Sequence, residues 1–179
     1  EILASCTSIV SVDQNGNVIH GRNLDYPFHP YLANLAVHYE FYRKGELLYE
    51  GDGSAAFLGI VTGMRPGAFG ISINERSKGG ALSTIYEIML RRTFSVPFYI
   101  RRVLERAENF TAAVELLSSE EFAAPCYLTV SCVAKNEGVV ITRDRRGVYN
   151  VSQIDFDSQD QWFLVQTNYD RDVPDPASD

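Results

Sequence analysis

Residues 6–25 read CTSIVSVDQNGNVIHGRNLD, and this stretch decides the fold of the N-terminal part of the chain. Two runs rich in β-branched and other apolar residues flank Asn15-Gly16. An Asn-Gly pair between such runs is the strongest short-range signal for a β-hairpin. The pattern therefore predicts strands at residues 7–12 and 18–24.

The same hairpin gathers three residues with possible chemistry. If the turn has two residues, counting back along both strands places Cys6 opposite Asp25. A carboxylate there raises a thiol pKa, but it would stabilise an α-ammonium group if Cys6 were the first residue of a cut chain. Arg22 carries the positive charge that favours a thiolate. Simple alternation puts Arg22 on the other face, so a bulge or strand end must turn it inward. Taken alone, the three residues favour a structural hairpin with a buried cysteine, a surface arginine and an aspartate that ends a strand.

Turn residues separate further strands along the chain. These strands are expected at residues 35–42, 46–49, 56–62, 68–74, 127–134, 139–142, 148–154 and 162–167. Helices lie between them: an apolar face at residues 82–90, a helix opened by Pro97 and a helix capped by Thr111. Strands, then helices, then strands predict an α+β fold rather than alternating βαβ units.

The composition is that of a globular protein with one core. The chain has 179 residues, of which 45% are hydrophobic and 22% charged. No apolar run approaches the ~20 residues that a membrane-spanning helix needs. The net charge of −7 argues against a nucleic-acid surface and against simple electrostatic docking on anionic lipid.

The cysteines and histidines form no metal signature, and we expect neither a metal nor a cofactor. The three histidines, His20, His29 and His38, share no ligand spacing. Cys126 and Cys132 would lie ~20 Å apart in one strand, so we predict two buried free thiols.

Two features suggest a processed secretory protein. The chain opens at Glu1 without a signal-peptide pattern and ends in a polar tail directly after a predicted strand, so we expect a fragment of a longer precursor. Asn109-Phe110-Thr111 and Asn150-Val151-Ser152 are sequons for N-glycosylation, expected on exposed segments.

Several motifs, in order, resemble those of the acid ceramidase and N-acylethanolamine-hydrolysing acid amidase family. Cys6-Thr7-Ser8-Ile9-Val10 and the stretch from His20 to Phe28 are similar to the start of the mature β-subunit in that family. The later matches are Asn74-Glu75-Arg76, then Glu137 to Arg143, then Thr167-Asn168-Tyr169-Asp170. The resemblance implies a four-layer αββα N-terminal nucleophile hydrolase, in which antiparallel sheets lie between helices.

The resemblance also implies roles for individual residues. Cys6 would be the nucleophile, first in autocatalytic cleavage of the bond after Ser5 and then in turnover, with its freed amine as general base. Arg22 would contact the thiol and Asp25 the α-amine. Asn168 would donate to the oxyanion, an interaction worth ~3 kcal/mol of barrier. The remaining site residues would be Glu75, which helps to position cleavage or substrate, and Asn74 as a further oxyanion donor.

Two departures from the family pattern shape the expected organisation. Residues 1–5 precede the nucleophile, so we expect them to be a remnant of the propeptide or α-subunit and residues 6–179 to be the hydrolase domain. A site arginine follows the Thr-Asn-Tyr-Asp motif in relatives, and this chain ends before it. The fold and the site are therefore expected to be incomplete at the C-terminus.

The function implied is hydrolysis of fatty-acyl amides, with N-acylethanolamines as the expected substrates and ceramide as the alternative. A papain-like hydrolase with His20 as base, and a non-catalytic lipid-binding relative, are competing hypotheses. Loss of Cys6, Arg22 or Asp25 would favour the binding protein, and all three are present. The expected partners are a lipid amide, the protein's own α-subunit or propeptide and, transiently, a membrane or micelle. We expect a lysosomal or secreted protein and no nucleic-acid partner.

Overall fold

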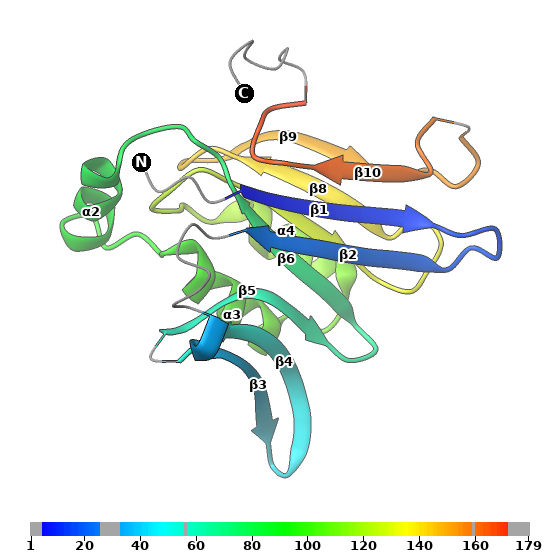
Figure 1. Ribbon diagram of the computed structural model, residues 1–179, viewed down its shortest axis with the longest axis horizontal. Coiled ribbons are helices and arrows are strands. Elements are labelled where there is room, and N and C mark those ends of the chain that lie inside the picture. The colour runs from blue at the N-terminus through cyan, green and yellow to red at the C-terminus, as the bar shows by residue number, and fades with distance from the viewer. Residues whose placement is uncertain (1–4, 26–32, 56, 159, 172–179) are drawn as a thin grey trace.

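The computed structural model describes residues 5–25, 33–55, 57–158 and 160–171. Two antiparallel sheets, one of three strands and one of seven, make up most of the described chain (Figure 1). The three-stranded sheet has the order β10-β1-β2, with β1 at Ser5–Val12, β2 at Val18–Asp25 and β10 at Phe163–Gln166. The earliest and latest strands of the described chain thus pair directly, Ser8 with Gln166.

The seven-stranded sheet follows chain order from β3 to β9. It is a meander, because every strand pairs with its immediate predecessor. Its strands are β3 (Ala36–Arg43), β4 (Glu46–Ser54), β5 (Phe57–Arg65), β6 (Phe69–Glu75), β7 (Cys126–Ser131), β8 (Gly138–Arg143) and β9 (Val148–Gln153). A short 3₁₀ helix, η1 at Ala33–Leu35, leads into β3. All strands expected in this region are present, with ends that differ by a few residues.

Three α-helices connect β6 to β7, as the sequence predicts. They are α2 (Ala81–Met89), α3 (Val96–Arg106) and α4 (Phe110–Ser119). Pro97 lies in the first turn of α3, where its missing N–H costs nothing. The predicted cap of α4 is wrong: Asn109, not Thr111, is the N-cap, and its Oδ1 accepts a hydrogen bond from the Ala112 N–H at 2.9 Å.

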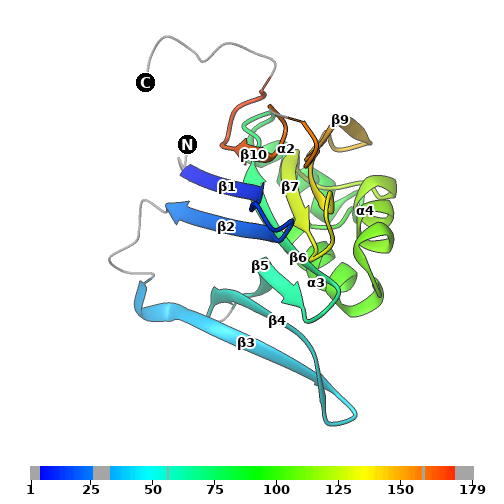
Figure 2. The same ribbon diagram turned by 90° about the vertical axis from the view of Figure 1, so that its right-hand side faces the viewer.

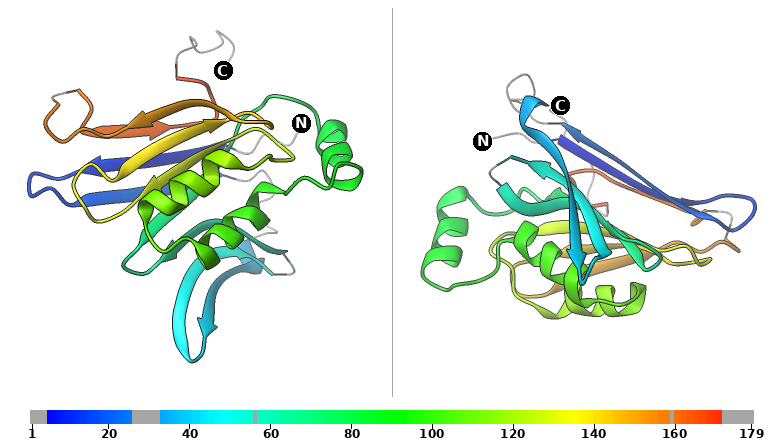
Figure 3. Two further views of the ribbon diagram at one scale, coloured as in Figure 1. Left: turned by 180° about the vertical axis from the view of Figure 1, so that it is seen from behind. Right: turned by 90° about the horizontal axis from the view of Figure 1, so that it is seen from below.

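The large sheet has a core on each face. One face packs against α3 and α4, where Ile100, Val103 and Leu104 of α3 are fully buried. The other face packs against the three-stranded sheet through Val10, Val12, Tyr127, Val140, Ile154 and Leu164. Figure 2 shows these layers side by side, and Figure 3 shows α3 and α4 lying across the large sheet from behind. Within the described ranges the layers run helix, sheet, sheet, which are three of the four layers of the expected αββα sandwich.

Helix α2 differs from α3 and α4 because its apolar side chains face outward. Leu82 is 84% exposed and Met89 71%. Figure 1 shows α2 apart from the sheets, beyond the strand ends. Within the described part of the chain, no helix is both long and apolar enough to cross a membrane.

The free thiols fit the prediction in part. Cys126 and Cys132 form no disulfide, as expected, and Cys126 is buried. Cys132 is partly exposed, because it follows the last residue of β7 rather than lying within the sheet.

Candidate active site

The β1–β2 hairpin carries the first part of the site, and its turn is one residue longer than predicted. The Asp13 N–H donates to the Asn17 carbonyl at 2.9 Å and the Gly16 N–H to the Asp13 carbonyl at 3.0 Å. Gln14, Asn15 and Gly16 therefore form a three-residue loop, with Gly16 at φ +84° in the left-handed region that glycine accepts without strain. The Asp13 carboxylate stabilises this loop, because its Oδ1 accepts hydrogen bonds from the Asn15 and Asn17 N–H groups.

The longer turn shifts the register by one residue. Cys6 pairs with Leu24 rather than with Asp25, which instead pairs with Ser5. The predicted juxtaposition of Cys6 and Asp25 is therefore wrong. Arg22 pairs with Ser8, and because Ser8 and Cys6 are two residues apart, Arg22 faces the same side as the thiol. No bulge is needed to bring the arginine to the cysteine.

Arg22 and Cys6 make the central contact of the site. Arg22 Nη2 lies 3.6 Å from Cys6 Sγ and also donates to the Ile73 carbonyl at 2.5 Å, while Nη1 donates to Thr62 Oγ1 at 2.6 Å. Cys6 is only 5% exposed. Burial raises the pKa of the thiol, and the charge of Arg22 opposes that rise. The guanidinium is thus tied to β5 and β6 while it faces the sulfur.

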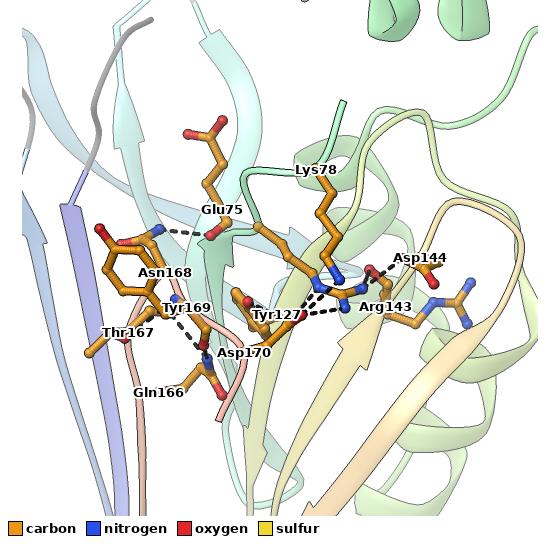
Figure 4. A network of polar contacts seen from close by, with 11 residues as sticks. Glu75, Lys78, Tyr127, Arg143, Asp144, Gln166, Thr167, Asn168, Tyr169 and Asp170 are labelled. Atoms are coloured by element: carbon orange, nitrogen blue, oxygen red, sulfur yellow. Dashed lines mark hydrogen bonds and ion pairs between the residues drawn. The ribbon is translucent and has the colours of Figure 1, made fainter. Parts of the chain in front are cut away.

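Asn168 meets Cys6 at its backbone nitrogen. The Cys6 N–H donates to Asn168 Oδ1 at 2.7 Å. Asn168 Nδ2 donates to the Glu75 carbonyl at 2.8 Å, as Figure 4 shows. This N–H belongs to the peptide bond between Ser5 and Cys6. The Asn168 side chain, which the resemblance implies as an oxyanion donor, is therefore engaged with the Cys6 nitrogen and with the end of β6.

Glu75 and Asp25 lie at strand ends on the exposed rim. Glu75 is the last residue of β6, and partial burial raises the pKa of its carboxyl. Its negative charge also raises the thiol pKa of Cys6, whereas its backbone N–H lowers it. Asp25 ends β2, opposite Ser5, and accepts a hydrogen bond from Asn23 Nδ2 at 2.9 Å.

Asn74 lies in a fully buried position between the sheets. Its Nδ2 donates to the carbonyls of Gln166 and Thr167, at 2.8 and 3.3 Å. Its Oδ1 accepts from Ser8 Oγ at 2.6 Å. Both amide hydrogens are therefore used to join β6 to the end of β10, and this arrangement does not support the expected oxyanion role.

A buried chain of hydroxyl groups leads from Asn74 to His20. Ser8 gives its only hydroxyl hydrogen to Asn74, so it must accept from Ser72 Oγ, 2.9 Å away. Ser72 then accepts from His20 Nε2 at 2.9 Å, and His20 Nδ1 accepts from Ser131 Oγ at 2.9 Å. This places the proton of neutral His20 on Nε2. Burial, reinforced by the Arg22 charge, lowers the pKa of His20 to about 4.

The His20 arrangement bears on the papain-like hypothesis. Both ring nitrogens of His20 are engaged with serine hydroxyls between the sheets, and Arg22 is the side chain in contact with the thiol. The geometry gives His20 no contact through which it could act as base to Cys6.

One histidine and two glutamate side chains, far along the chain from Cys6, could offer ligands to a metal. His38, Glu40 and Glu50, on the β3–β4 hairpin, bring one ligand atom each within 4.8 Å of one another. His38 Nδ1 also lies 2.8 Å from Asp52 Oδ1, and this contact raises the pKa of the histidine. His38 and Glu40 are exposed. His38 pairs across the strands with Glu50 and Asp52, and Glu40 accepts a hydrogen bond from Tyr42 Oη at 2.8 Å.

The glycosylation candidates are accessible. Asn109 and Asn150 are both exposed, the first at the start of α4 and the second on β9, an edge strand of the large sheet. The cap at Asn109 uses Oδ1, so its Nδ2 is not part of the cap.

Sequence reasoning missed a buried ion pair beside the site. Arg76 is 2% exposed and forms a bidentate ion pair with Asp170, Nε to Oδ1 at 2.7 Å and Nη2 to Oδ2 at 2.9 Å. Both residues belong to motifs already singled out in the sequence: Arg76 directly follows Glu75, and Asp170 is the last residue of Thr167-Asn168-Tyr169-Asp170. Only the fold brings these two segments together.

Comparisons with known proteins assign the chain to a family. Residues 6–172 match the family described as linear amide C–N hydrolases, choloylglycine hydrolase family. The N-acylethanolamine-hydrolyzing acid amidase of Caenorhabditis elegans is 42% identical over 166 residues, covering 92% of this chain and 46% of that protein. Human acid ceramidase is 34% identical over 187 residues, covering 96% of this chain and 47% of the ceramidase.

A solved structure supports the fold directly. The Caenorhabditis elegans N-acylethanolamine-hydrolyzing acid amidase ortholog superposes with a TM-score of 0.83 at 41% identity, covering 92% of this chain and 70% of that one. The chain spans about half the length of the curated relatives it matches. By its family match, its sequence identity to these relatives and its fold, this chain belongs to the choloylglycine hydrolase family of linear amide C–N hydrolases.

Proposed function

We propose that this protein hydrolyses the amide bond of fatty-acyl conjugates, with Cys6 as nucleophile after the bond between Ser5 and Cys6 is cut. The observation that carries the proposal is the pair of contacts on Cys6. Arg22 lies 3.6 Å from its sulfur, and Asn168 accepts from its backbone N–H at 2.7 Å. Both reacting atoms of an N-terminal nucleophile, the sulfur and the nitrogen, thus have a charged or polar partner.

Maturation follows from the same contacts. The sulfur of Cys6 adds to the carbonyl carbon of Ser5, and the tetrahedral intermediate collapses with cleavage of the C–N bond. The Cys6 nitrogen leaves as an amine that has taken up the thiol proton, and its N–H faces Asn168 Oδ1 from the outset. Water hydrolyses the resulting thioester, which releases a Ser5 carboxylate and restores the thiol.

Turnover repeats this chemistry on a lipid amide. The freed α-amine accepts the thiol proton, the sulfur attacks the substrate carbonyl and the substrate amine leaves with that proton. Water then releases the fatty acid from the thioester. Arg22 stabilises the thiolate, and Asp25, opposite the former position of Ser5, stabilises the ammonium form of the amine. Glu75, whose backbone N–H contacts the thiol, positions cleavage or substrate.

The oxyanion of both steps needs a donor, and Asn168 remains the proposed one. Its Nδ2 already donates one hydrogen to the Glu75 carbonyl. Stabilising the oxyanion therefore requires the second Nδ2 hydrogen or a rotation of the side chain.

N-acylethanolamines are the proposed substrates, because amidases named for them are 36–42% identical to this chain. Ceramide is the second candidate, because acid ceramidases are 33–34% identical. The exposed apolar side chains of α2 suit transient contact with the membrane or micelle that delivers such a lipid. Two exposed sequons favour a secretory or lysosomal protein, and a propeptide or α-subunit is the proposed partner.

The test is a substrate panel at acidic pH. The full precursor, expressed in a secretory host and allowed to mature, is given N-acylethanolamines and ceramides that carry the same acyl chain. We expect faster release of fatty acid from the acylethanolamines and none from either lipid in Cys6→Ala. Equal release by Cys6→Ala, or no release from any lipid amide by matured wild-type protein, would contradict the proposal.

A further inference from the structure

The ion pair between Arg76 and Asp170 lies one residue from Glu75 and two residues from Asn168. The Arg76 side chain is 1% exposed and that of Asp170 is 7%. A paired guanidinium and carboxylate that share two parallel hydrogen bonds are fixed in orientation as well as distance. The pair therefore constrains how the two segments lie against each other.

Other groups complete the pair. Tyr127 Oη donates to Asp170 Oδ1 at 2.8 Å and Lys78 Nζ lies 2.8 Å from Oδ2, as Figure 4 shows. On the far side, Arg76 Nη1 donates to Asp144 Oδ1 at 2.7 Å. Hydrogen bonds from Arg76 hold the pKa of Asp170 far below its usual range, so the pair stays charged at acidic pH.

The last two residues of β6 and Arg76, which follows them, contact four residues of the segment 166–170. Asn74 donates to the carbonyls of Gln166 and Thr167. The Glu75 carbonyl accepts from Asn168, and Arg76 forms the ion pair with Asp170. Asn168 lies between the two outer anchors. Its position against the Cys6 N–H therefore depends on both of them.

We propose that Arg76 and Asp170 are positioning residues that hold Asn168 against the nitrogen of Cys6, both in the uncut chain and after cleavage. Only the expected effect on cleavage and turnover rests on the proposed function. The expected effect on the position of Asn168 does not, because the contact with the Cys6 N–H exists in the uncut chain. Loss of the Asp170 anchor frees one end of the segment. Asn168 then moves away from Cys6, and a displacement of about 1 Å near reacting groups can slow a reaction about a hundredfold.

The experiment compares Asp170→Asn with Asp144→Asn in the full precursor. Both changes remove a carboxylate that contacts Arg76, but only Asp170 belongs to the Asn168 segment, so Asp144→Asn is the matched control. Asp170→Glu, which keeps the charge but lengthens the side chain, serves if Asp170→Asn is too unstable to purify. Thermal unfolding of each variant shows how much stability each carboxylate contributes.

The first measurement is hydrogen exchange of the backbone amide at position 6 in a Cys6→Ala background, where we expect no cleavage. We expect exchange roughly tenfold faster in the Asp170 variants, as expected for loss of about one hydrogen bond, and unchanged in Asp144→Asn. The second measurement is cleavage and turnover with Cys6 present. We expect Asp170 variants to lose about a hundredfold in cleavage rate and kcat with little change in KM.

The two measurements separate the two proposals. If the wild-type protein hydrolyses no lipid amide but exchange at residue 6 responds to Asp170 alone, the proposed function fails and the positioning role stands. If Asp170 and Asp144 variants match each other in exchange and in rate, the positioning role is overturned, whatever the substrate.

Discussion

The contact between Arg22 and Cys6 predicts how the reactivity of the Cys6 thiol responds to loss of one charge. The perturbation is Arg22→Gln, which removes the positive charge and keeps a hydrogen-bonding side chain. Two unit charges 3.6 Å apart interact by about 4 to 5 kcal/mol at an effective dielectric constant of about 20. Partial exposure of Arg22 and screening by salt reduce this value. An opposite charge at such a distance changes the thiolate fraction of a neighbouring thiol by about ten- to a thousandfold.

The assay is alkylation of Cys6 by iodoacetamide as a function of pH in matured protein. Only the thiolate reacts, and below the thiol pKa the labelling rate is proportional to the small thiolate fraction. Loss of Arg22 should therefore slow labelling about ten- to a thousandfold at a given acidic pH. Maturation must precede the assay, because the same change can block cleavage. Arg22→Lys keeps the charge and should label more nearly like the wild-type protein.

Thr62→Val is the matched control for lost contacts. It removes a hydrogen-bond partner of Arg22 without changing any charge. We expect its labelling profile to stay close to that of the wild type. Identical profiles for Arg22→Gln and wild-type protein would refute the claim that Arg22 tunes the thiol.

Two further predictions concern the buried histidine and the sequons. The pKa of His20 is lowered to about 4, so the unfolded chain binds more protons between about pH 6.5 and 4. The free energy of unfolding should therefore fall as pH falls through that window, by up to about 3 kcal/mol. Measured by denaturant unfolding, it should depend less on pH in His20→Gln than in the wild-type protein. An equal pH dependence in the two proteins would contradict this prediction. Thr111→Ala and Ser152→Ala should each abolish one glycan mass shift from protein made in a secretory host, while Asn109 keeps its cap on α4. A glycan retained in either variant, or none in the wild type, would show the assignment to be wrong.

Local signals in the sequence predicted the elements better than their pairing. Asn15-Gly16 marked the first hairpin, but the Asp13 carboxylate and the left-handed Gly16 made a three-residue loop of it. One residue of register decides whether Arg22 or Asp25 faces Cys6. A side-chain contribution to a turn is difficult to infer from turn residues alone, because several loop lengths suit the same residues. The start of α4 was uncertain for a similar reason: Asn109 and Thr111 are both suitable capping residues, and Asn109 is the N-cap.

The site itself could not be assembled from spacing. Asn168 lies 162 residues from Cys6 along the chain and reaches it because β10 pairs with β1 in a separate small sheet. Glu75 is brought in by a different sheet. The resemblance to a family named these residues in advance, but it did not reveal that Asn168 contacts the Cys6 nitrogen or that Arg76 anchors its segment. Those contacts depend on how the two sheets pack.

The most direct test of Cys6 as the catalytic nucleophile is the mass of the acyl-enzyme. Matured protein is mixed with an N-acylethanolamine, quenched in acid within the first turnover and digested, and the peptide that begins at Cys6 is weighed. The mechanism predicts an N-terminus at Cys6 and a mass increase equal to the fatty acyl group, labile to hydroxylamine as a thioester is. An acyl group on any other residue, or rapid turnover by protein whose chain does not begin at Cys6, would contradict it.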